Sequence, residues 1–368
     1  MAVETIESPF VAHWNPTNQH LKDPVPNFVQ RIVRIVWNIF SVLIFPIGLI
    51  RLAAYGIGRL AAAVILPSRL MPDWLIKQFN EKFHNFWFDP IQPNNPDQVA
   101  LRNHFTASKH SILTPDGALL SANLFRHRDA NAMTPTLICF QPNAGSSAQD
   151  GYRWLLKDAI AKGTPFNFVT FDYRSVGNSK GSFRSTKDLI VDGTSILQWV
   201  RQTLHTPDDQ IHFYGLSLGG AYATKTMATD PEKLIGRLAN IKSLASLDEV
   251  LCGFLPLSLE PLARFVCKIL KTQGYELNAV ADFNKLQGQK LVVYHPEDPV
   301  IPWKASLQQS VNHPNFLKLT LDPDDIDAAI EIARYNHHNA PLEYYGNAKS
   351  QVTDFIFNRP AAQQEDAG

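Results

Sequence analysis

Residues 211–228, IHFYGLSLGGAYATKTMA, join a run of β-type residues to a helical run through a glycine-rich turn. The turn places Ser217 between Gly215 and Gly219 in a Gly-x-Ser-x-Gly pattern. A sharp strand-to-helix turn leaves no room for Cβ atoms at the two glycines and exposes the serine at the end of the strand. The helix behind it offers unpaired N–H groups. The segment favours an α/β sheet, although these residue types are too common for the pattern alone to identify a nucleophile.

Segments with strand and helix patterns alternate along the second half of the chain. Residues 188–204 have apolar positions at helical spacing, as do the residues that follow Ser217. The segments with strand patterns are 110–126, which includes the turn signal Pro-Asp-Gly of a hairpin, and 134–147, 166–182, 290–306 and 316–322. We expect the last two strands to be buried. This alternation predicts a mainly parallel sheet with helices on both faces.

An acid and a base are expected at the ends of later strands, at the same edge of the sheet as Ser217. Asp298 follows the apolar run 291–294, with Glu297 as its competitor. His337 and His338 are adjacent and come after the last predicted strand. The chain order of serine, acid and histidine is that of one large class of hydrolases.

Four pieces of the sequence together resemble the α/β-hydrolase superfamily over residues 106–357. They are GLSLGG, FDYRSVGNSKGS, HPEDPVIP and HHN. The resemblance implies an α/β-hydrolase fold with Ser217 as nucleophile, Asp298 as the orienting acid and His338 as the base, because relatives often carry His-Asn at that position. His337 is the alternative base. The chain departs from the family pattern at 322–336, an acidic insertion before the histidines that we interpret as a short helix.

The same resemblance assigns two more groups of residues. Where relatives have His-Gly-Asn-Ala-Gly, this chain reads QPNAG at 141–145, so Asn143 and Leu218 would donate the N–H groups of an oxyanion hole. The segment with Asp172 and Arg174 normally loops beside the site, and we expect both residues to be structural.

The segment 24–72 is unusual in charge, because it carries five arginines and no acidic residue. Within it, 35–50 is a run of sixteen uncharged residues, about 24 Å as a helix, which is short of the ~30 Å hydrocarbon core. We predict that an apolar helical leader over 28–72 associates with membranes, chiefly anionic lipid, through 28–68. The alternatives are a spanning pair of helices and helices packed on the protein's own core or on a partner.

The rest of the N-terminal third divides into two segments. Residues 1–27 are polar and proline-rich, without a secretory signal, and predict a flexible N-terminus. Residues 73–105 predict an amphipathic helix and a linker, and a polar tail occupies 358–368. The leader joined to a hydrolase core more weakly resembles the CHLPS family of Chlamydia and the SidB-like proteins of Legionella. That resemblance implies a membrane-associated effector, on the cytoplasmic side or exported into a host cell without a signal peptide.

Composition and motifs limit the function classes. Lysine plus arginine equals aspartate plus glutamate at 34 each, and no basic patch is interleaved with stacking aromatics, so we expect no nucleic-acid partner. Three cysteines give no disulfide framework. The sequence contains no zinc, Walker or dinucleotide-binding motif, and we expect neither metal nor cofactor.

The sequence therefore favours a serine hydrolase that cleaves an ester or thioester, with a lipid or acyl substrate, through an acyl-enzyme. The segment at about 247–285, apolar at helical spacing, predicts a lid that suits an acyl chain or a cap packed on the core. Two alternatives stay open: a catalytically silent hydrolase fold that serves as an effector or binding module at a membrane, and a peptidase on the same fold.

Overall fold

The computed structural model describes residues 9–21 and 65–358, apart from gaps at 231, 233, 255, 312–315 and 323–336, and a few separate residues between 28 and 56. Most of the predicted leader lies outside the described residues, as does the predicted helix in 322–336. Among the described residues, every helix is too short or too polar to cross a lipid bilayer.

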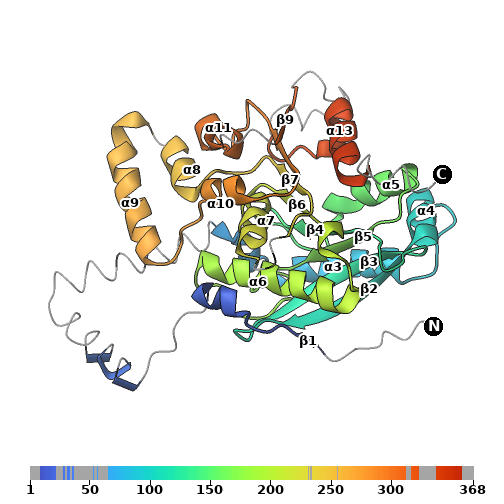
Figure 1. Cartoon of the computed structure of the whole chain (residues 1–368), viewed down its shortest axis with the longest axis horizontal. Coiled ribbons are helices and arrows are strands. Elements are labelled where there is room, and N and C mark those ends of the chain that lie inside the picture. The colour runs from blue at the N-terminus through green and yellow to red at the C-terminus, as the bar shows by residue number, and fades with distance from the viewer. Residues whose placement is uncertain are drawn as a thin grey trace.

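A nine-stranded sheet in the order β1-β2-β3-β5-β4-β6-β7-β8-β9 organises the described part of the chain (Figure 1). All neighbours from β5 to β9 are parallel, whereas β2 pairs antiparallel with β3, and β3 with β5. The mainly parallel sheet is confirmed, and so is the hairpin. The strands are Phe10–Val11, Phe105–Leu113, Leu119–His127, Thr136–Phe140, Asn167–Phe171, Ile211–Leu216, Leu238–Ile241, Lys290–Tyr294 and Leu317–Thr320 for β1 to β9.

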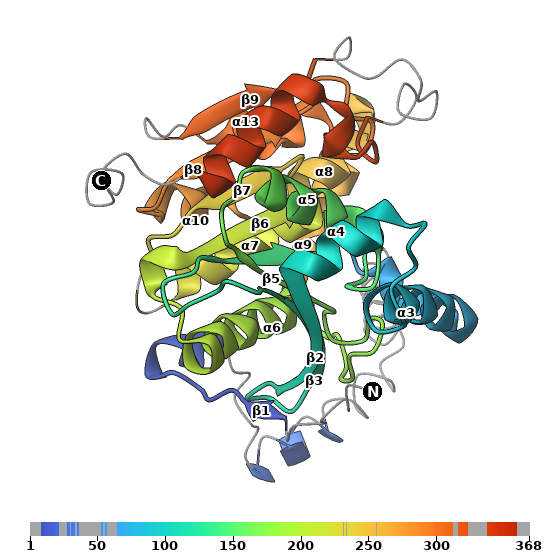
Figure 2. The ribbon, with the colours of Figure 1, turned by 90° about the vertical axis from the view of Figure 1, so that its right-hand side faces the viewer.

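Helices cover both faces of the sheet, and α6 and α13 lie on opposite sides of it (Figure 2). Successive residues of β4 alternate between the two apolar clusters: Ile138 and Phe140 join one, and Leu137 and Cys139 join the other. The helices are α3 Asp73–Trp87, α4 Pro96–His104, α5 Arg153–Ala161, α6 Thr186–Trp199, α7 Leu218–Thr229, α8 Leu247–Phe254, α9 Glu260–Thr272, α10 Val280–Lys285, α11 Leu307–Ser310 and α13 Gly346–Phe357. Because parallel strands end at one edge, the residues after β6, β7 and β8 lie together there.

Two predictions about strand burial and the N-terminus are wrong. The strand β9 is largely exposed, with Leu317 60% accessible, because it is the last strand of the sheet and has a neighbour on one side only. The flexible N-terminus expected over 1–27 does not hold for 9–21. There, β1 pairs with β2, and Leu21 joins the core beside α6.

The boundaries around the leader also differ from the prediction. Ile65 and Leu66 are 6% and 0% accessible and belong to an apolar core cluster on the sheet, although the sequence placed them in the leader. The linker expected before residue 106 contains a second helix, α4, which Asn95 caps through a bond from the Gln98 N–H and which Pro96 begins. The pair Asn95-Pro96 is a helix start that can be recognised in the sequence.

A buried arginine connects the hairpin to α6. Arg174 is 1% accessible, and its guanidinium donates to both carboxylate oxygens of Asp116, at 2.5 and 2.9 Å, and to Asp192 at 2.8 Å. Burial raises the pKa of Asp192 to about 6 against the opposing charge of Arg174. Nearby, the Asp172 carboxylate accepts the Ser147 N–H at 2.6 Å and the Asn178 N–H at 3.1 Å. These contacts agree with the structural roles expected for Asp172 and Arg174.

We expect Arg174→Ala to lower the free energy of unfolding by about 3–5 kcal/mol, because it leaves the Asp192 carboxylate buried without its partner. Urea denaturation measures the difference. The matched control is Arg264→Ala, which removes an exposed pair with Glu260 on α9 and should leave the transition in place. Equal midpoints for the two variants would contradict a stabilising role for the buried network.

Candidate active site

The turn between β6 and α7 holds Ser217 in a strained conformation, with φ 54° and ψ −122°. Its N–H donates to the Ile241 carbonyl at 2.8 Å, which ties the turn to β7. A Cβ on Gly219 would lie 2.3 Å from the Phe140 carbonyl oxygen, and one on Gly215 would lie 2.5 Å from the Gly220 Cα. The glycines are therefore required by backbone packing, and Ser217 is directed to the end of the sheet.

His338 bridges Ser217 and Asp298. Its Nε2 lies 2.8 Å from the Ser217 Oγ, and its Nδ1 lies 2.7 Å from the Asp298 Oδ2. All three side chains are buried, at 7%, 4% and 8% accessible for the histidine, serine and aspartate. The structure thus brings together the three residues that the sequence singled out, from a loop after β6, a loop after β8 and the segment that precedes α13.

The Asp298 carboxylate is held from both sides. Its Oδ1 accepts the N–H groups of Val300 at 2.8 Å and Ile301 at 2.7 Å. Burial raises the pKa of Asp298, but the His338 hydrogen bond and charge and the two N–H groups outweigh it and bring the pKa below its ordinary value. Because the carboxylate is ionised and can only accept, His338 donates through Nδ1–H, which leaves Nε2 to accept the Ser217 hydroxyl.

The alternative acid, Glu297, and the alternative base, His337, make other contacts. Glu297 is exposed, and its Oε2 is 3.7 Å from the His337 Nε2. The His337 ring stacks on His295, with centroids 3.9 Å apart and planes 10° apart, rather than facing Ser217. The geometry therefore favours His338 over His337 and Asp298 over Glu297.

The residues expected to form an oxyanion hole lie around the same space. Leu218 is the first residue of α7, where helix geometry leaves main-chain N–H groups without intrahelical partners. Asn143 lies in a turn that the Gly145 N–H closes onto the Pro142 carbonyl at 3.0 Å. Both residues line one cavity with Ser217 and His338, and Pro142 has no N–H to offer.

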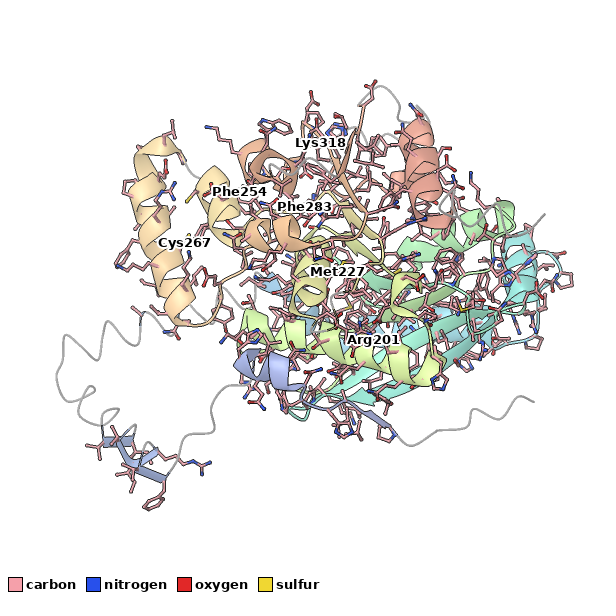
Figure 3. All side chains as sticks on the ribbon, in the orientation of Figure 1. Arg201, Met227, Phe254, Cys267, Phe283 and Lys318 are labelled. Carbon is pink, nitrogen blue, oxygen red and sulfur yellow. The ribbon has the colours of Figure 1, made fainter. Side chains whose placement is uncertain are left out.

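That cavity measures about 490 Å³, and its wall is mostly apolar. The helix α8 contributes Leu247, Val250 and Phe254, and Ile65 contributes from the end of the predicted leader. Figure 1 shows α9 outside α8, and Figure 3 labels Phe254 on α8 and Cys267 on α9. The predicted lid thus supplies one wall of the cavity through its first helix.

The part of the chain that the structure describes contains no cluster of three or more His, Cys, Asp or Glu side chains arranged to hold a metal ion. The chemistry available at the site is that of a hydroxyl, an imidazole, a carboxylate and main-chain N–H groups.

Comparisons with known proteins show which fold carries this site. The X-Pro dipeptidyl-peptidase (S15) family matches residues 116–246, which include Ser217 but neither Asp298 nor His338. An esterase of Pyrococcus furiosus aligns over 73% of this chain and 94% of its own with a TM-score of 0.50 and 17% identity, which shows a shared fold. The fold, the order of the three residues and the matched segment agree. The chain has the fold of the α/β-hydrolase superfamily and is similar to it in sequence over the matched segment.

Two curated proteins show sequence similarity to part of this chain. Protein bem46 of Schizosaccharomyces pombe is 26% identical over 162 residues, which are 44% of this chain and 52% of that protein. Lysophosphatidylserine lipase ABHD12 of Gallus gallus is 26% identical over 183 residues, 46% of this chain and 45% of that protein. The chain therefore spans about half the length of the curated relatives it matches.

Sequence reasoning missed two residues of this hydrolase site. Ile65 lines the cavity, and Lys242, directly after β7, is buried beside it. The signal that could have found Lys242 is a lysine directly after the short run LANI, at the strand edge where the site forms. No local pattern marks Ile65, because the fold alone brings it to the cavity.

The two histidines should differ when each is replaced. We expect His338→Ala to slow the labelling of Ser217 by a fluorophosphonate probe by about 10²–10⁴-fold, because the change removes the imidazole that is hydrogen-bonded to the Ser217 Oγ. His337→Ala should label at close to the unaltered rate, since its ring lies on His295. Time-resolved labelling measures both rates, and a slow His337 variant beside a fast His338 variant would reverse the assignment.

Proposed function

We propose that this chain is a serine hydrolase that cleaves acyl esters or thioesters through Ser217, His338 and Asp298. One observation carries the proposal: hydrogen bonds run from the Ser217 Oγ through the His338 ring to Asp298 without a break, at 2.8 and 2.7 Å. Structural histidines seldom join a serine in a strained turn to a buried carboxylate, whereas nucleophilic catalysis requires that arrangement.

The proposed reaction has two steps. His338 Nε2 takes the Ser217 proton as Oγ attacks the acyl carbonyl, and the Leu218 and Asn143 N–H groups stabilise the oxyanion. The imidazolium then gives its proton to the departing alcohol or thiol, and the acyl group stays on Ser217. Water attacks the acyl-enzyme with His338 again as base, which releases the acid and restores the serine. Asp298 holds the imidazole and offsets its positive charge in both steps.

The apolar wall favours an acyl substrate. A cavity of about 490 Å³ lined by α8 and Ile65 can enclose a hydrocarbon chain next to Ser217, and burial of each CH₂ contributes about 0.8 kcal/mol. The similarity to a lysophosphatidylserine lipase and to an esterase supports this class. The S15 match keeps a peptidase as the second candidate, and turnover of an X-Pro peptide in place of acyl esters would favour it.

Replacing Ser217 tests its proposed role as the nucleophile. We expect Ser217→Ala to abolish fluorophosphonate labelling and to reduce p-nitrophenyl ester turnover by about 10⁴-fold or more. The fold should be unchanged, because the alanine leaves the glycine packing of the turn intact. Steady-state turnover and a thermal melt measure the two. Undiminished turnover in the folded variant would reject the nucleophile, and a wild-type protein that neither labels nor turns over would favour the silent binding module.

The proposed location is a membrane surface, with the leader as its anchor. The support is the sequence, with five arginines and no acidic residue over 24–72 beside long apolar runs. Ile65, near the end of the predicted leader, is buried and lines the cavity. A membrane bound by the leader would therefore lie close to the site. The effector role implied by the Chlamydia and Legionella resemblance stays a prediction, and none of the relatives above bears on it.

Liposome flotation tests the anchor in the full-length chain. We expect the protein to float with anionic vesicles and to do so poorly with neutral ones, because each basic residue near the surface adds about 1 kcal/mol. Replacing Arg31, Arg34, Arg51 and Arg59 by glutamine should weaken flotation and leave ester turnover in solution unchanged. Flotation that does not depend on lipid charge or on these arginines would contradict the proposed electrostatic contribution, and resistance to alkaline extraction would favour a spanning pair.

A further inference from the structure

Lys242 is a buried lysine next to the proposed catalytic residues. It follows β7 directly, has φ 48°, and its main-chain N–H donates to the Val293 carbonyl at 2.7 Å. Only 2% of the residue is accessible, and it borders the cavity that contains Ser217. Among the described residues, no carboxylate forms an ion pair with its Nζ within 4.0 Å. A lysine rarely occupies such a place unless its polar end makes specific bonds.

The bonds of this lysine go to the loop that carries His338. The Nζ donates to the His337 carbonyl at 2.5 Å and to the Ala340 carbonyl at 2.8 Å. It also lies 5.0 Å from the centre of the Tyr345 ring. The two carbonyls lie on either side of His338 in the chain, so one side chain holds both ends of the short segment from which the imidazole projects.

This loop needs an attachment of its own. In the sequence, residues 321–336 separate β9 from His337, so the sheet's last strand does not lead directly to the histidine. Lys242 provides a link from β7, the strand to which the Ser217 N–H is also bonded through Ile241. Contacts with the end of β7 therefore hold both the nucleophile and the base in position.

We propose that Lys242 is a positioning residue, which fixes the main chain around His338 so that the imidazole stays aligned between Ser217 and Asp298. The inference rests on the proposed function and adds a residue that does not touch the reacting atoms. A general base has to return to one place in both steps of acyl transfer, and a misplacement of about 1 Å can reduce the rate by about 10²-fold.

The protonation state of Lys242 does not decide this role. Burial lowers the pKa of Lys242 to about 7, and the charge of Asp298 opposes the shift. Both the ammonium and the neutral amine carry at least two N–H bonds, so either form can donate to the two carbonyls. The link therefore persists on both sides of neutral pH.

The test replaces the lysine by a side chain of similar length without donors. With a p-nitrophenyl acyl ester, Lys242→Met should lower kcat by about 10–100-fold. KM should change by no more than about twofold, because the binding wall is kept. Fluorophosphonate labelling of Ser217 should slow by the same factor as kcat. A purely structural role would reduce the fraction of folded protein without this split between kcat and KM in the folded enzyme.

Lys290 is a matched control. It is also 2% accessible, its Nζ donates to the Leu286 carbonyl at 2.6 Å, and it lies 5.5 Å from the Phe283 ring, but it begins β8 at the edge of the sheet away from Ser217. We expect Lys290→Met to lower the thermal midpoint and to leave kcat and the labelling rate of the folded protein unchanged.

The outcomes separate this inference from the proposed function. If wild-type protein does not label at Ser217, the proposed function fails first. If wild type labels and a folded Lys242→Met variant labels and turns over at the same rate, or changes KM alone, Lys242 does not position the base. Should the Met variant not fold, Lys242→Gln takes its place. Its side chain is one bond shorter, so its amide cannot reach both carbonyls as the lysine does, and we expect kcat to fall at unchanged KM. Wild-type kcat in the folded Gln variant would overturn the inference.

Discussion

The close approach of β4, β6 and the start of α7 is the constraint on which the site depends. With the Gly219 backbone against the Phe140 carbonyl and Gly215 against Gly220, neither glycine can carry a side chain. Ser217 is forced to a positive φ between them, and its side chain can only leave the sheet at the carboxyl end of β6. The strain is maintained because the surrounding core is well packed on both faces, and it directs Oγ to the position that His338 reaches.

Two buried charged groups beside this turn have partners on other elements. Asp298 faces His338 and two main-chain N–H groups, and Lys242 faces two carbonyls. Farther from the site, Arg174 joins the hairpin to α6. In a medium of low polarity each such group is stable only when its partner is present, so these contacts define one arrangement of the loops. The precision of the Ser217–His338–Asp298 relay follows from that requirement.

The sequence predictions that the structure confirms came from local patterns. The glycine spacing around Ser217 follows from a backbone contact within one turn, and the alternation of strand and helix patterns follows from burial on two faces, so both are legible in the chain. Preference for His338 over His337 came from the family resemblance, and the structure gives the physical reason in the stacking of His337 on His295.

Features that depend on distant contacts were missed. The strand β9 is exposed because it lies at the sheet edge. Residues 9–21 have a defined structure because β1 pairs with β2. Ile65 is buried because it lines the cavity. Lys242 was not singled out in the sequence, because only the fold places the carbonyls of His337 and Ala340 within its reach.

The central claim is that Ser217 forms a covalent acyl intermediate. It is tested most directly by quenching the reaction of full-length protein with an activated acyl ester in acid within the first turnover, followed by peptide mass spectrometry. We predict one acyl group per chain on the peptide that contains Ser217, formed at the rate of a burst of released alcohol. Ester turnover without a covalent adduct, or with the acyl group on another residue, would contradict the account.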